Sequence, residues 1–276
     1  MKRKNAYNTI IFLFIFFILL LFLVPFYILV LNTFKPTSDF LTKPFAFPEV
    51  WNLDNYTKAI KTMHFQSTLS NTALITIVAT LFNTLLASMT GYFFARKKWK
   101  INKLIFSLFL ASMVAPFQVY MIPLVKIYGG SLGLSNNLFL VAYIAAALNI
   151  PFAVFLYNGF AAGIPLELDE AARIDGCGFT KTFFTIIFPL LKPIMITVMV
   201  FVALGSWNDY LMTSLFLTKT ETRTLAIAAF SFLSNHTADY SPMMAGLLLG
   251  IIPILIFYFL GQKYIIEGVV AGSVKG

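Results

Sequence analysis

Residues 9–31 read TIIFLFIFFILLLFLVPFYILVL, a run of 23 residues without a charged side chain. About 20 apolar residues suffice for a helix to cross the hydrocarbon core of a bilayer. Lys2, Arg3 and Lys4 precede the run, as basic residues precede a secretory signal peptide. However, the run is too long for a signal peptide, and no small-x-small cleavage site follows Leu31. We therefore interpret it as an uncleaved anchor helix.

The remainder of the chain is similarly apolar. Of its 276 residues, 59% are hydrophobic, 11% are charged and 31 are Phe, and the mean hydropathy is +0.84. Soluble domains average roughly 45–50% apolar and ~25% charged residues. The composition excludes a soluble enzyme, a disordered chain and a nucleic-acid-binding protein. It predicts an all-α integral membrane protein in contact with lipid, with little mass outside the bilayer.

Six segments are apolar and long enough to be transmembrane helices. They are Thr9–Leu31 and, approximately, Leu69–Ala95, Leu104–Val125, Asn137–Tyr157, Ile186–Met212 and Pro242–Leu260. With the N-terminus inside, the inner segments 1–8, 96–103, 158–185 and 261–276 carry 12 Lys and Arg residues, whereas the outer segments 32–68, 126–136 and 213–241 carry 7. Because Lys and Arg are enriched on the cytoplasmic side of membrane proteins, the sequence predicts an N-in/C-in arrangement.

The sequence is organised into three parts. Residues 1–66 comprise the anchor helix and an external loop, residues 67–262 form the core with its cytoplasmic loop, and residues 263–276 form a cytoplasmic tail. The external loop 32–68 contains several prolines and aromatic residues. It is a small ordered cap, a loop that docks a partner, or a plain connector.

Sequence patterns for catalysis and metal binding are missing. There is no G-x-x-x-x-G-K-[ST] motif, which is one common device for binding the phosphates of ATP. His64 and His236 fall in predicted external loops, far from the single cysteine, Cys177, so no metal-ligand spacing is present. No histidine lies in a predicted span, where it could activate a nucleophile such as Ser206. We therefore expect a transport subunit and not an enzyme.

The stretch IPLELDEAARIDG, residues 164–176, joins the fourth and fifth predicted spans. Pro165 suits the first position of a helix, and Gly176 suits the position just after its end. The acidic residues Glu167, Asp169 and Glu170 fill the early turns, where the helix dipole favours anions. The sequence therefore predicts a short surface helix over residues 165–176.

One face of this helix is suited to docking against another surface. The residues at helical spacing on that face are Leu168, Ala171, Ala172 and Asp175. The two alanines allow a close approach, and Glu170 and Arg173 flank the contact. The alternative is a helix lying on the membrane surface. Because this helix is acidic and the inner leaflet is usually anionic, a protein partner with a basic groove is favoured.

The run Glu170-Ala171-Ala172-x-x-x-Gly176-x9-Ile186-x-Phe188-Pro189 resembles the E-A-A-x-x-x-G-x9-I-x-L-P signature of ABC-importer permease subunits. Phe188 stands where leucine is usual, an exchange of one apolar residue for another. Three further stretches are similar to those of carbohydrate permeases: Met113-x-x-Pro116-x-Gln118-Val119-x-x-Ile122-Pro123-Leu124, Gly205–Tyr210 and the tail Gly268–Gly276. The tail resembles that of the second permease of maltose and multiple-sugar importers. The resemblance covers roughly residues 10–276.

The resemblance implies the fold of a type I ABC importer permease in the bacterial cytoplasmic membrane. It implies ATP-driven import of a carbohydrate, with an oligosaccharide as the expected class. The implied partners are a second homologous permease, an extracellular sugar-binding protein and two cytoplasmic ABC ATPase subunits, which bind ATP and Mg. The chain itself is expected to hold no cofactor and no metal.

The resemblance also implies roles for particular residues. It identifies residues 165–176 as a coupling helix that docks into a cleft of the ATPase. The residues expected to couple the chain to the ATPase are Glu170, Ala171, Ala172, Arg173, Asp175 and Gly176. Glu170 is expected to pair with a basic residue there, and Gly176 to permit a sharp turn. The C-terminal tail is expected to contact the ATPase pair as well.

Polar side chains in the predicted spans are candidates for the sugar pathway, because polar groups near the middle of the bilayer face a cavity or another helix. Counted along straight helices, Asn83, Gln118 and Asn149 fall near the middle of the bilayer. The span of Gln118 also contains Pro116 and Pro123, and the span of Asn149 contains Pro151. Prolines break helices, and a broken helix leaves backbone groups that need water or protein partners. A hydrated lumen and hydrogen bonding between helices are both consistent with this pattern.

The outer end of the fifth predicted span carries Trp207, Asn208 and Asp209. We expect these residues to form an external gate or to meet the binding protein. An aromatic anchor at the membrane interface explains Trp207 equally well.

Two alternative functions remain open from the sequence. The first is a permease of the same superfamily for another solute, such as glycerol phosphate, because the docking helix does not report the solute. The second is an ion-coupled secondary transporter. It is disfavoured because the predicted spans lack mid-membrane carboxylates, Asp209 being peripheral.

Overall fold

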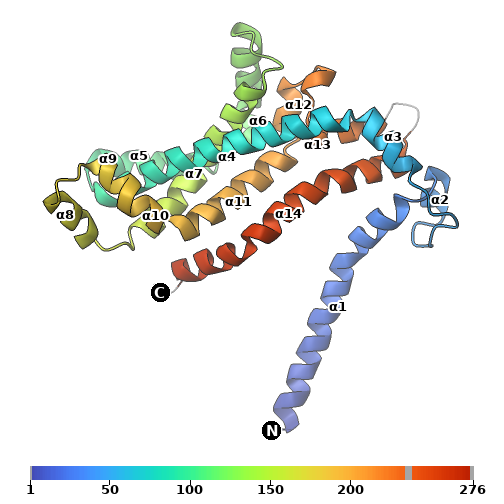
Figure 1. The fold of residues 1–276 in the computed structure, drawn as a ribbon, viewed down its shortest axis with the longest axis horizontal. Coiled ribbons are helices and arrows are strands. Elements are labelled where there is room, and N and C mark those ends of the chain that lie inside the picture. The colour runs from blue at the N-terminus through green and yellow to red at the C-terminus, as the bar shows by residue number, and fades with distance from the viewer. Residues whose placement is uncertain (1, 234–237, 274–276) are drawn as a thin grey trace. The chain divides into compact units, whose positions relative to one another are not determined.

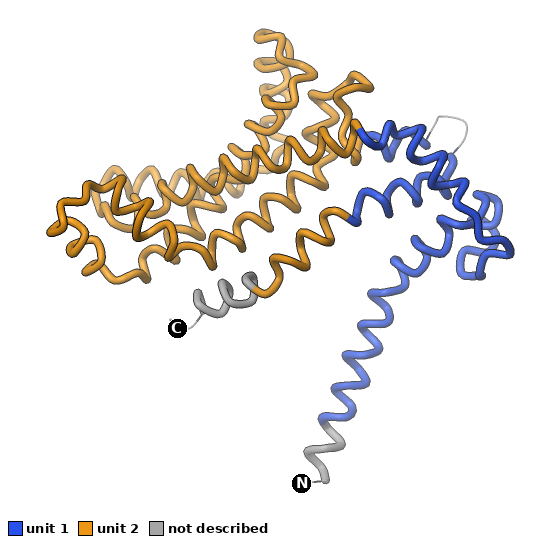
Figure 2. Tube along the Cα trace, viewed as in Figure 1, with its two compact units in different colours: residues 1–66, 228–252 blue, residues 67–227, 253–276 orange. Residues whose placement is uncertain are grey.

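The computed structural model describes residues 2–233 and 238–273, and these fold almost entirely into helices (Figure 1). No strand forms within these residues; one isolated β-bridge pairs Leu233 with Ala238. His236 and the last three residues of the predicted tail, 274–276, lie outside the described residues. The chain forms two compact units, coloured in Figure 2. Unit 1 comprises residues 1–66 and 228–252, and unit 2 comprises residues 67–227 and 253–276.

Unit 1 begins with a long helix, most of whose length is exposed within the described residues. Its elements are α1 (Lys2–Asn32), α2 (Thr37–Thr42), α3 (Asp54–Thr62), η4 (Phe230–Phe232) and the first part of α14 (Tyr240–Ser273). In the most apolar 18-residue stretch of α1, within Asn8–Asn32, 0% of the residues are buried. A helix that is apolar on all sides needs lipid or another protein around it. The prediction of an anchor helix here agrees with this helix.

The loop after α1 folds back onto the end of that helix. Asn32 Nδ2 donates a hydrogen bond to the carbonyl oxygen of Pro44 at 2.9 Å, and the Tyr27 hydroxyl donates one to that of Phe45 at 3.0 Å. These bonds satisfy backbone carbonyls that a loose loop would leave to water. The first part of the loop is therefore held in place against the end of α1.

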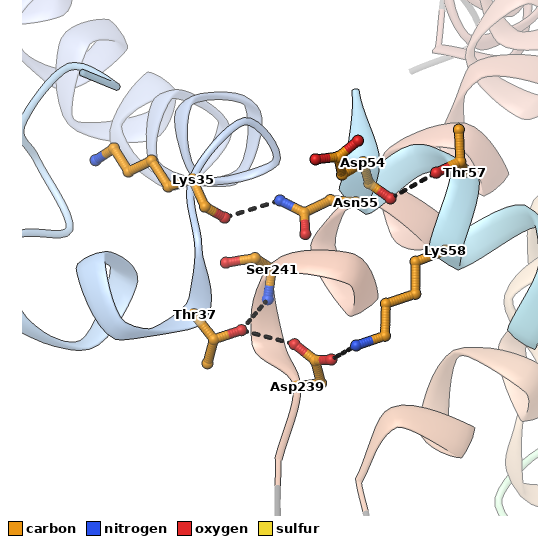
Figure 3. Close-up of polar contacts among 8 residues, drawn as sticks. All are labelled: Lys35, Thr37, Asp54, Asn55, Thr57, Lys58, Asp239 and Ser241. Carbon is orange, nitrogen blue, oxygen red and sulfur yellow. Dashed lines mark hydrogen bonds and ion pairs between the residues drawn. The ribbon is translucent and has the colours of Figure 1, made fainter. Parts of the chain in front are cut away.

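Asp239 joins the start of α14 to α2 and α3 (Figure 3). Its carboxylate accepts a hydrogen bond from Thr37 Oγ1 at 2.7 Å and forms an ion pair with the Lys58 ammonium. Desolvation alone would raise the pKa of the Asp239 carboxyl, but the bonds from Lys58 and Thr37 and the charge of Lys58 outweigh it. The pKa of Asp239 therefore lies below its usual value.

We expect Asp239→Asn to destabilise unit 1 near neutral pH by about 1 kcal/mol or less, because the pair is partly exposed and screened by solvent. A folded-state pKa below the unfolded one gives stability that is complete above the unfolded pKa and is lost as the pH falls through the folded pKa. Hydrogen exchange of the α2 and α3 amides should therefore differ between variant and wild type at neutral pH. The two should converge as the pH falls through the folded-state pKa of the Asp239 carboxyl.

The control for this measurement is Asp54→Asn, because the Asp54 carboxylate takes no part in the Asp239 contacts drawn in Figure 3. If the hydrogen-exchange rates of Asp239→Asn and wild type still differed at low pH, the carboxylate charge would not be the cause of the destabilisation.

Unit 2 is a helical core built along α4. Its elements are α4 (Phe65–Arg96, from Ser67 onward), α5 (Lys100–Ser112), α6 (Phe117–Leu124), η1 (Val125–Ser131), α7 (Leu138–Ala161), α8 (Glu167–Ile174), α9 (Phe179–Thr182), η2 (Phe183–Ile187), α10 (Phe188–Leu190), α11 (Lys192–Asn208), α12 (Leu211–Phe216), η3 (Thr220–Thr222), most of α13 (Leu225–Ala229) and the rest of α14. One apolar cluster contains Tyr92, Tyr157 and Phe183, and another contains Ile75 and Phe216. Helix α4 contributes to both clusters, and α7 packs against α11.

The described residues contain four helices that are long and apolar enough to cross a membrane, or six spans if each of two bent helix pairs counts as one. The four are Asn8–Asn32, Phe65–Arg96, Leu138–Ala161 and Tyr240–Lys263. The bent pairs are Lys100–Ser112 with Phe117–Ser131, at 95°, and Phe179–Leu190 with Lys192–Asn208, at 80°. All six predicted segments are therefore matched by apolar helices or bent pairs.

The third and fifth predicted spans are bent pairs of helices and not single straight helices. Helix α5 ends at Ser112 and α6 begins at Phe117, because Pro116 lacks an N–H and disfavours helical backbone at the preceding residue. In the fifth segment the break falls at Leu191, and Pro193 lies in the first turn of α11. That helix ends at Asn208, before the predicted limit of Met212.

Candidate functional site

The loop between α7 and α11 carries the short helix predicted from the sequence. Helix α8 spans Glu167–Ile174, so it is shorter than predicted; Pro165 lies before it and Leu166 is its N-cap. At the other end Gly176 has φ +75°, as a residue just after a helix often has. The Cys177 N–H donates to the Ala172 carbonyl at 2.8 Å and the Gly176 N–H to the Arg173 carbonyl at 3.0 Å, which is a Schellman motif.

The charged residues of α8 are distributed so that they stabilise the helix locally. Glu167, Asp169 and Glu170 lie in its first turn and Arg173 in its last turn. Acidic groups near the N-terminus and a basic group near the C-terminus both interact favourably with the helix dipole. The caps and charges therefore predict the helix from local sequence alone.

Asp169 fixes α8 to the end of α4. Its carboxylate is buried, accepts a hydrogen bond from the Tyr92 hydroxyl and forms an ion pair with Arg96, whose Nη2 lies 2.9 Å from Oδ2. The Arg96 Nε also donates to the same oxygen at 2.9 Å. One side of α8 is therefore held by charged contacts within the chain.

The other side of α8 is exposed. Of the residues predicted to couple to an ATPase, those exposed are Glu170, Ala171, Arg173, Asp175 and Gly176. Ala172 is instead buried at 2% exposure, so the predicted docking face is wrong at that position: Ala172 packs towards its own chain together with Asp169. Ile174, which the sequence analysis did not single out, is 86% exposed.

Asp169 and Ile174 were missed for different reasons. An aspartate in the first turn of a helix is explained by its favourable interaction with the helix dipole, whether its side chain is exposed or buried. The pairing of Asp169 with Arg96, 73 positions earlier, therefore left no local signal in the sequence. Ile174 carried no distinguishing signal in the sequence, because single apolar side chains are common on protein surfaces.

The polar residues predicted near the middle of the membrane make separate contacts. Asn83 is buried, and its Nδ2 donates to the Ala146 carbonyl at 3.1 Å, which links α4 to α7. Asn149 donates to the Ala145 carbonyl of its own helix at 2.8 Å. Gln118 is exposed at the start of α6. The count of its depth assumes a straight helix, whereas a 95° bend precedes Gln118 in the structure.

The three residues at the end of α11 have different environments. Asn208 is exposed, and its Nδ2 donates to the Leu204 carbonyl at 2.9 Å. The Asp209 carboxylate accepts hydrogen bonds from the N–H groups of Met212 and Thr213, both at 3.2 Å, and so caps the short helix α12.

Trp207 lines a cavity of about 220 Å³ between α4, α11 and α14. Thr76 and Thr80 of α4 and Phe257 of α14 contribute to the same lining, which is mostly apolar. The three predicted gate residues are thus adjacent in sequence, but only Trp207 among them lines this cavity.

Comparison with known proteins identifies one family. The model of the family described as "Binding-protein-dependent transport system inner membrane component" matches residues 84–270. This range includes the second part of α4, all of α8 and most of α14. It therefore covers more than half of the chain.

Similar proteins align over nearly the full length. The chain is 39% identical to the probable starch degradation products transport system permease protein of Thermoanaerobacterium thermosulfurigenes, over 93% of each chain. It is 35% identical to the melibiose/raffinose/stachyose import permease protein of Bacillus subtilis, over 92% of this chain and 91% of that one. Its fold is similar to that of a chain in the crystal structure of a bacterial ABC transporter involved in the import of the acidic polysaccharide alginate. That match has a TM-score of 0.79 and 19% identity, over 96% of this chain and 98% of the other.

Proposed function

This chain belongs to the family of binding-protein-dependent transport system inner membrane components, and we propose that it forms half of the membrane pathway of an ATP-driven carbohydrate importer. The family consists of transport subunits and not of catalysts. The proposed cargo class is an oligosaccharide, and this is supported by relatives named for starch degradation products and for melibiose, raffinose and stachyose. These relatives favour a sugar over another solute such as glycerol phosphate.

The proposed assembly contains a second permease, two cytoplasmic ATPase subunits that bind ATP and Mg, and an external sugar-binding protein. Both ends of this chain then lie in the cytoplasm, in agreement with the distribution of Lys and Arg. The observation that supports coupling to an ATPase is α8: a rigid, capped helix, fixed on one side and exposed on the other.

The proposal is tested by purifying the tagged chain in mild detergent and identifying the proteins that accompany it by mass spectrometry. The expected result is a second multi-span permease together with an ATPase that carries a Walker motif. If the chain came alone and transported solute in proteoliposomes under an ion gradient without ATP, the proposal would be overturned in favour of a secondary transporter.

Ile174 is the side chain on α8 that we expect to anchor it in the ATPase. Interface energy concentrates in a few apolar or aromatic groups that become buried on binding, and Ile174 is 86% exposed in this chain. Ile174→Ser should therefore weaken the co-purification of the ATPase about tenfold or more. The matched control is Leu166→Ser, just before the helix. Equal ATPase recovery with Ile174→Ser and with wild type would contradict the assignment.

Gln118 and Asn83 are predicted to respond differently to substitution by alanine. Gln118 is exposed beside the bend at Pro116, so Gln118→Ala should raise the concentration of loaded binding protein that half-maximally stimulates ATP hydrolysis, by about two- to tenfold. Asn83→Ala breaks a bond between helices and should lower the melting temperature without that shift. Identical half-maximal concentrations for Gln118→Ala and wild type would remove Gln118 from the pathway.

A further inference from the structure

The side chains of Tyr92, Arg96 and Asp169 form a buried polar cluster between the end of α4 and α8, which we call the α4–α8 joint. Asp169 is 3% exposed, and the Arg96 side chain is 9% exposed. Both carboxylate oxygens are used: Oδ1 accepts a hydrogen bond from the Tyr92 hydroxyl, and Oδ2 accepts one from Arg96 Nε and forms an ion pair with Nη2. A carboxylate held at both oxygens has a fixed orientation as well as a fixed position.

Arg96 connects more than two segments. Its Nη1 donates to the Ala161 carbonyl at 3.2 Å, at the end of α7, and its Nη2 donates to the Ile164 carbonyl at 3.0 Å, in the loop that leads to α8. One guanidinium, carried by the last residue of α4, therefore contacts the last residue of α7, the loop that leads to α8, and α8 itself. Because the guanidinium is planar and its donors are fixed, these three segments have a defined geometry relative to one another.

Tyr92 supports the cluster from the opposite side. Its ring stacks on Phe179 with the ring centres 4.9 Å apart, and lies 5.5 Å from the ring of Phe183. The α4–α8 joint thus also contacts α9 and η2, which lead into α10 and α11. Aromatic contacts of this kind favour particular ring orientations, so they hold the hydroxyl in place.

A buried ion pair contributes little net stability, because desolvation of both charges offsets their attraction. Removing one partner is costly, however, since the other charge is left buried and unpaired. Such a pair therefore acts less as a source of stability than as a constraint on how two segments can move apart.

The chain connects α8 directly to α7 and, through α9, η2 and α10, to α11, but α4 lies 73 residues earlier. We propose that the α4–α8 joint is the mechanical link through which movement of α8 reaches α4, so that Asp169, Arg96 and Tyr92 are positioning residues for transport. This inference rests on the proposed function, in which an ATPase moves α8. Helix α4 carries Asn83 and lines the cavity at Trp207, so its movement would reach the polar and gate residues.

The test uses the complete complex in proteoliposomes, with its binding protein and with radiolabelled raffinose and maltotriose as probe sugars. The quantity measured is the number of sugar molecules transported per ATP hydrolysed. Asp169→Asn should lower this ratio about tenfold, because it removes the charge that pairs with Arg96. Tyr92→Phe keeps the ion pair and should lower it about two- to threefold. Glu167→Gln, an exposed carboxylate on the same helix, should leave it unchanged.

The outcomes separate the α4–α8 joint from the function on which it rests. A wild-type complex that transports neither sugar in response to ATP would count against the proposed function. If wild type is coupled and Asp169→Asn loses transport and ATP hydrolysis in equal proportion, the contact is only structural and the inference is overturned. If Asp169→Asn does not assemble, Tyr92→Phe decides: a lowered ratio supports the link, and a ratio equal to that of wild type overturns it.

Discussion

Glu170→Lys is expected to abolish sugar uptake, with a loss of about a hundredfold or more, while the chain still inserts into the membrane. Glu170 is exposed in the first turn of α8, on the side that the α4–α8 joint leaves free. If this side enters a basic groove of the ATPase, reversal of the charge replaces an attraction by a repulsion. Two like charges forced together across an interface cost several kcal/mol.

The effect of Glu170→Lys is measured as uptake of labelled sugar into cells, alongside the amount of chain in the membrane fraction. The matched control is Glu167→Lys, which makes the same charge change in the same turn and carries a similar helix-dipole penalty. Only the position on the helix differs. Wild-type uptake by Glu170→Lys would show that α8 does not dock through this residue, and equal loss in both variants would point to the helix dipole instead.

Local signals in the sequence were sufficient to predict α8. Its acidic first turn and its glycine cap act within a few residues of chain, so the helix is visible before any tertiary contact is known. The positive φ of Gly176 confirms the predicted cap. The beginning was misplaced by two residues, from Pro165 to Glu167, because helix starts are set partly by the preceding loop.

The features that the sequence could not provide depend on distant partners. The pairing of Asp169 with Arg96 joins residues 73 positions apart, and no spacing rule connects them. The prolines near Gln118 predicted a broken helix, but a bend of 95° depends on what each half packs against. A depth count at a constant rise per residue requires an unbroken helix, which α4 provides for Asn83 and the bent pair does not provide for Gln118.

Gly91→Ala is expected to have the largest effect on the stability of unit 2. Gly91 lies where α4 meets α7, and a Cβ built on it would sit 2.6 Å from the Cβ of Tyr157 and 2.9 Å from the backbone nitrogen of Asn158. Both atoms belong to or are bonded to the backbone of α7, so rotation of a side chain cannot relieve the contact. One of the two helices has to move.

That movement would disturb contacts on both sides of the crossing. Tyr92, the next residue, is buried in the apolar cluster and belongs to the α4–α8 joint. Overpacking of a close-packed core typically costs 1–3 kcal/mol, and contact with backbone falls at the upper end, so Gly91→Ala should lower the free energy of unfolding by roughly 2–3 kcal/mol. Small residues at helix crossings are a common feature of membrane proteins, because they allow backbones to approach closely.

The control for Gly91→Ala is Gly159→Ala in α7, where an added Cβ would meet nothing within 4 Å. Because alanine favours a helix by up to about 1 kcal/mol over glycine, this variant should melt at the same temperature as wild type or slightly higher. Both variants are compared by thermal unfolding in the same detergent. If Gly91→Ala had the same melting temperature as Gly159→Ala, the backbones of α4 and α7 would not be in close contact at Gly91. The position of Tyr92 in the α4–α8 joint, which depends on that contact, would then be wrong as well.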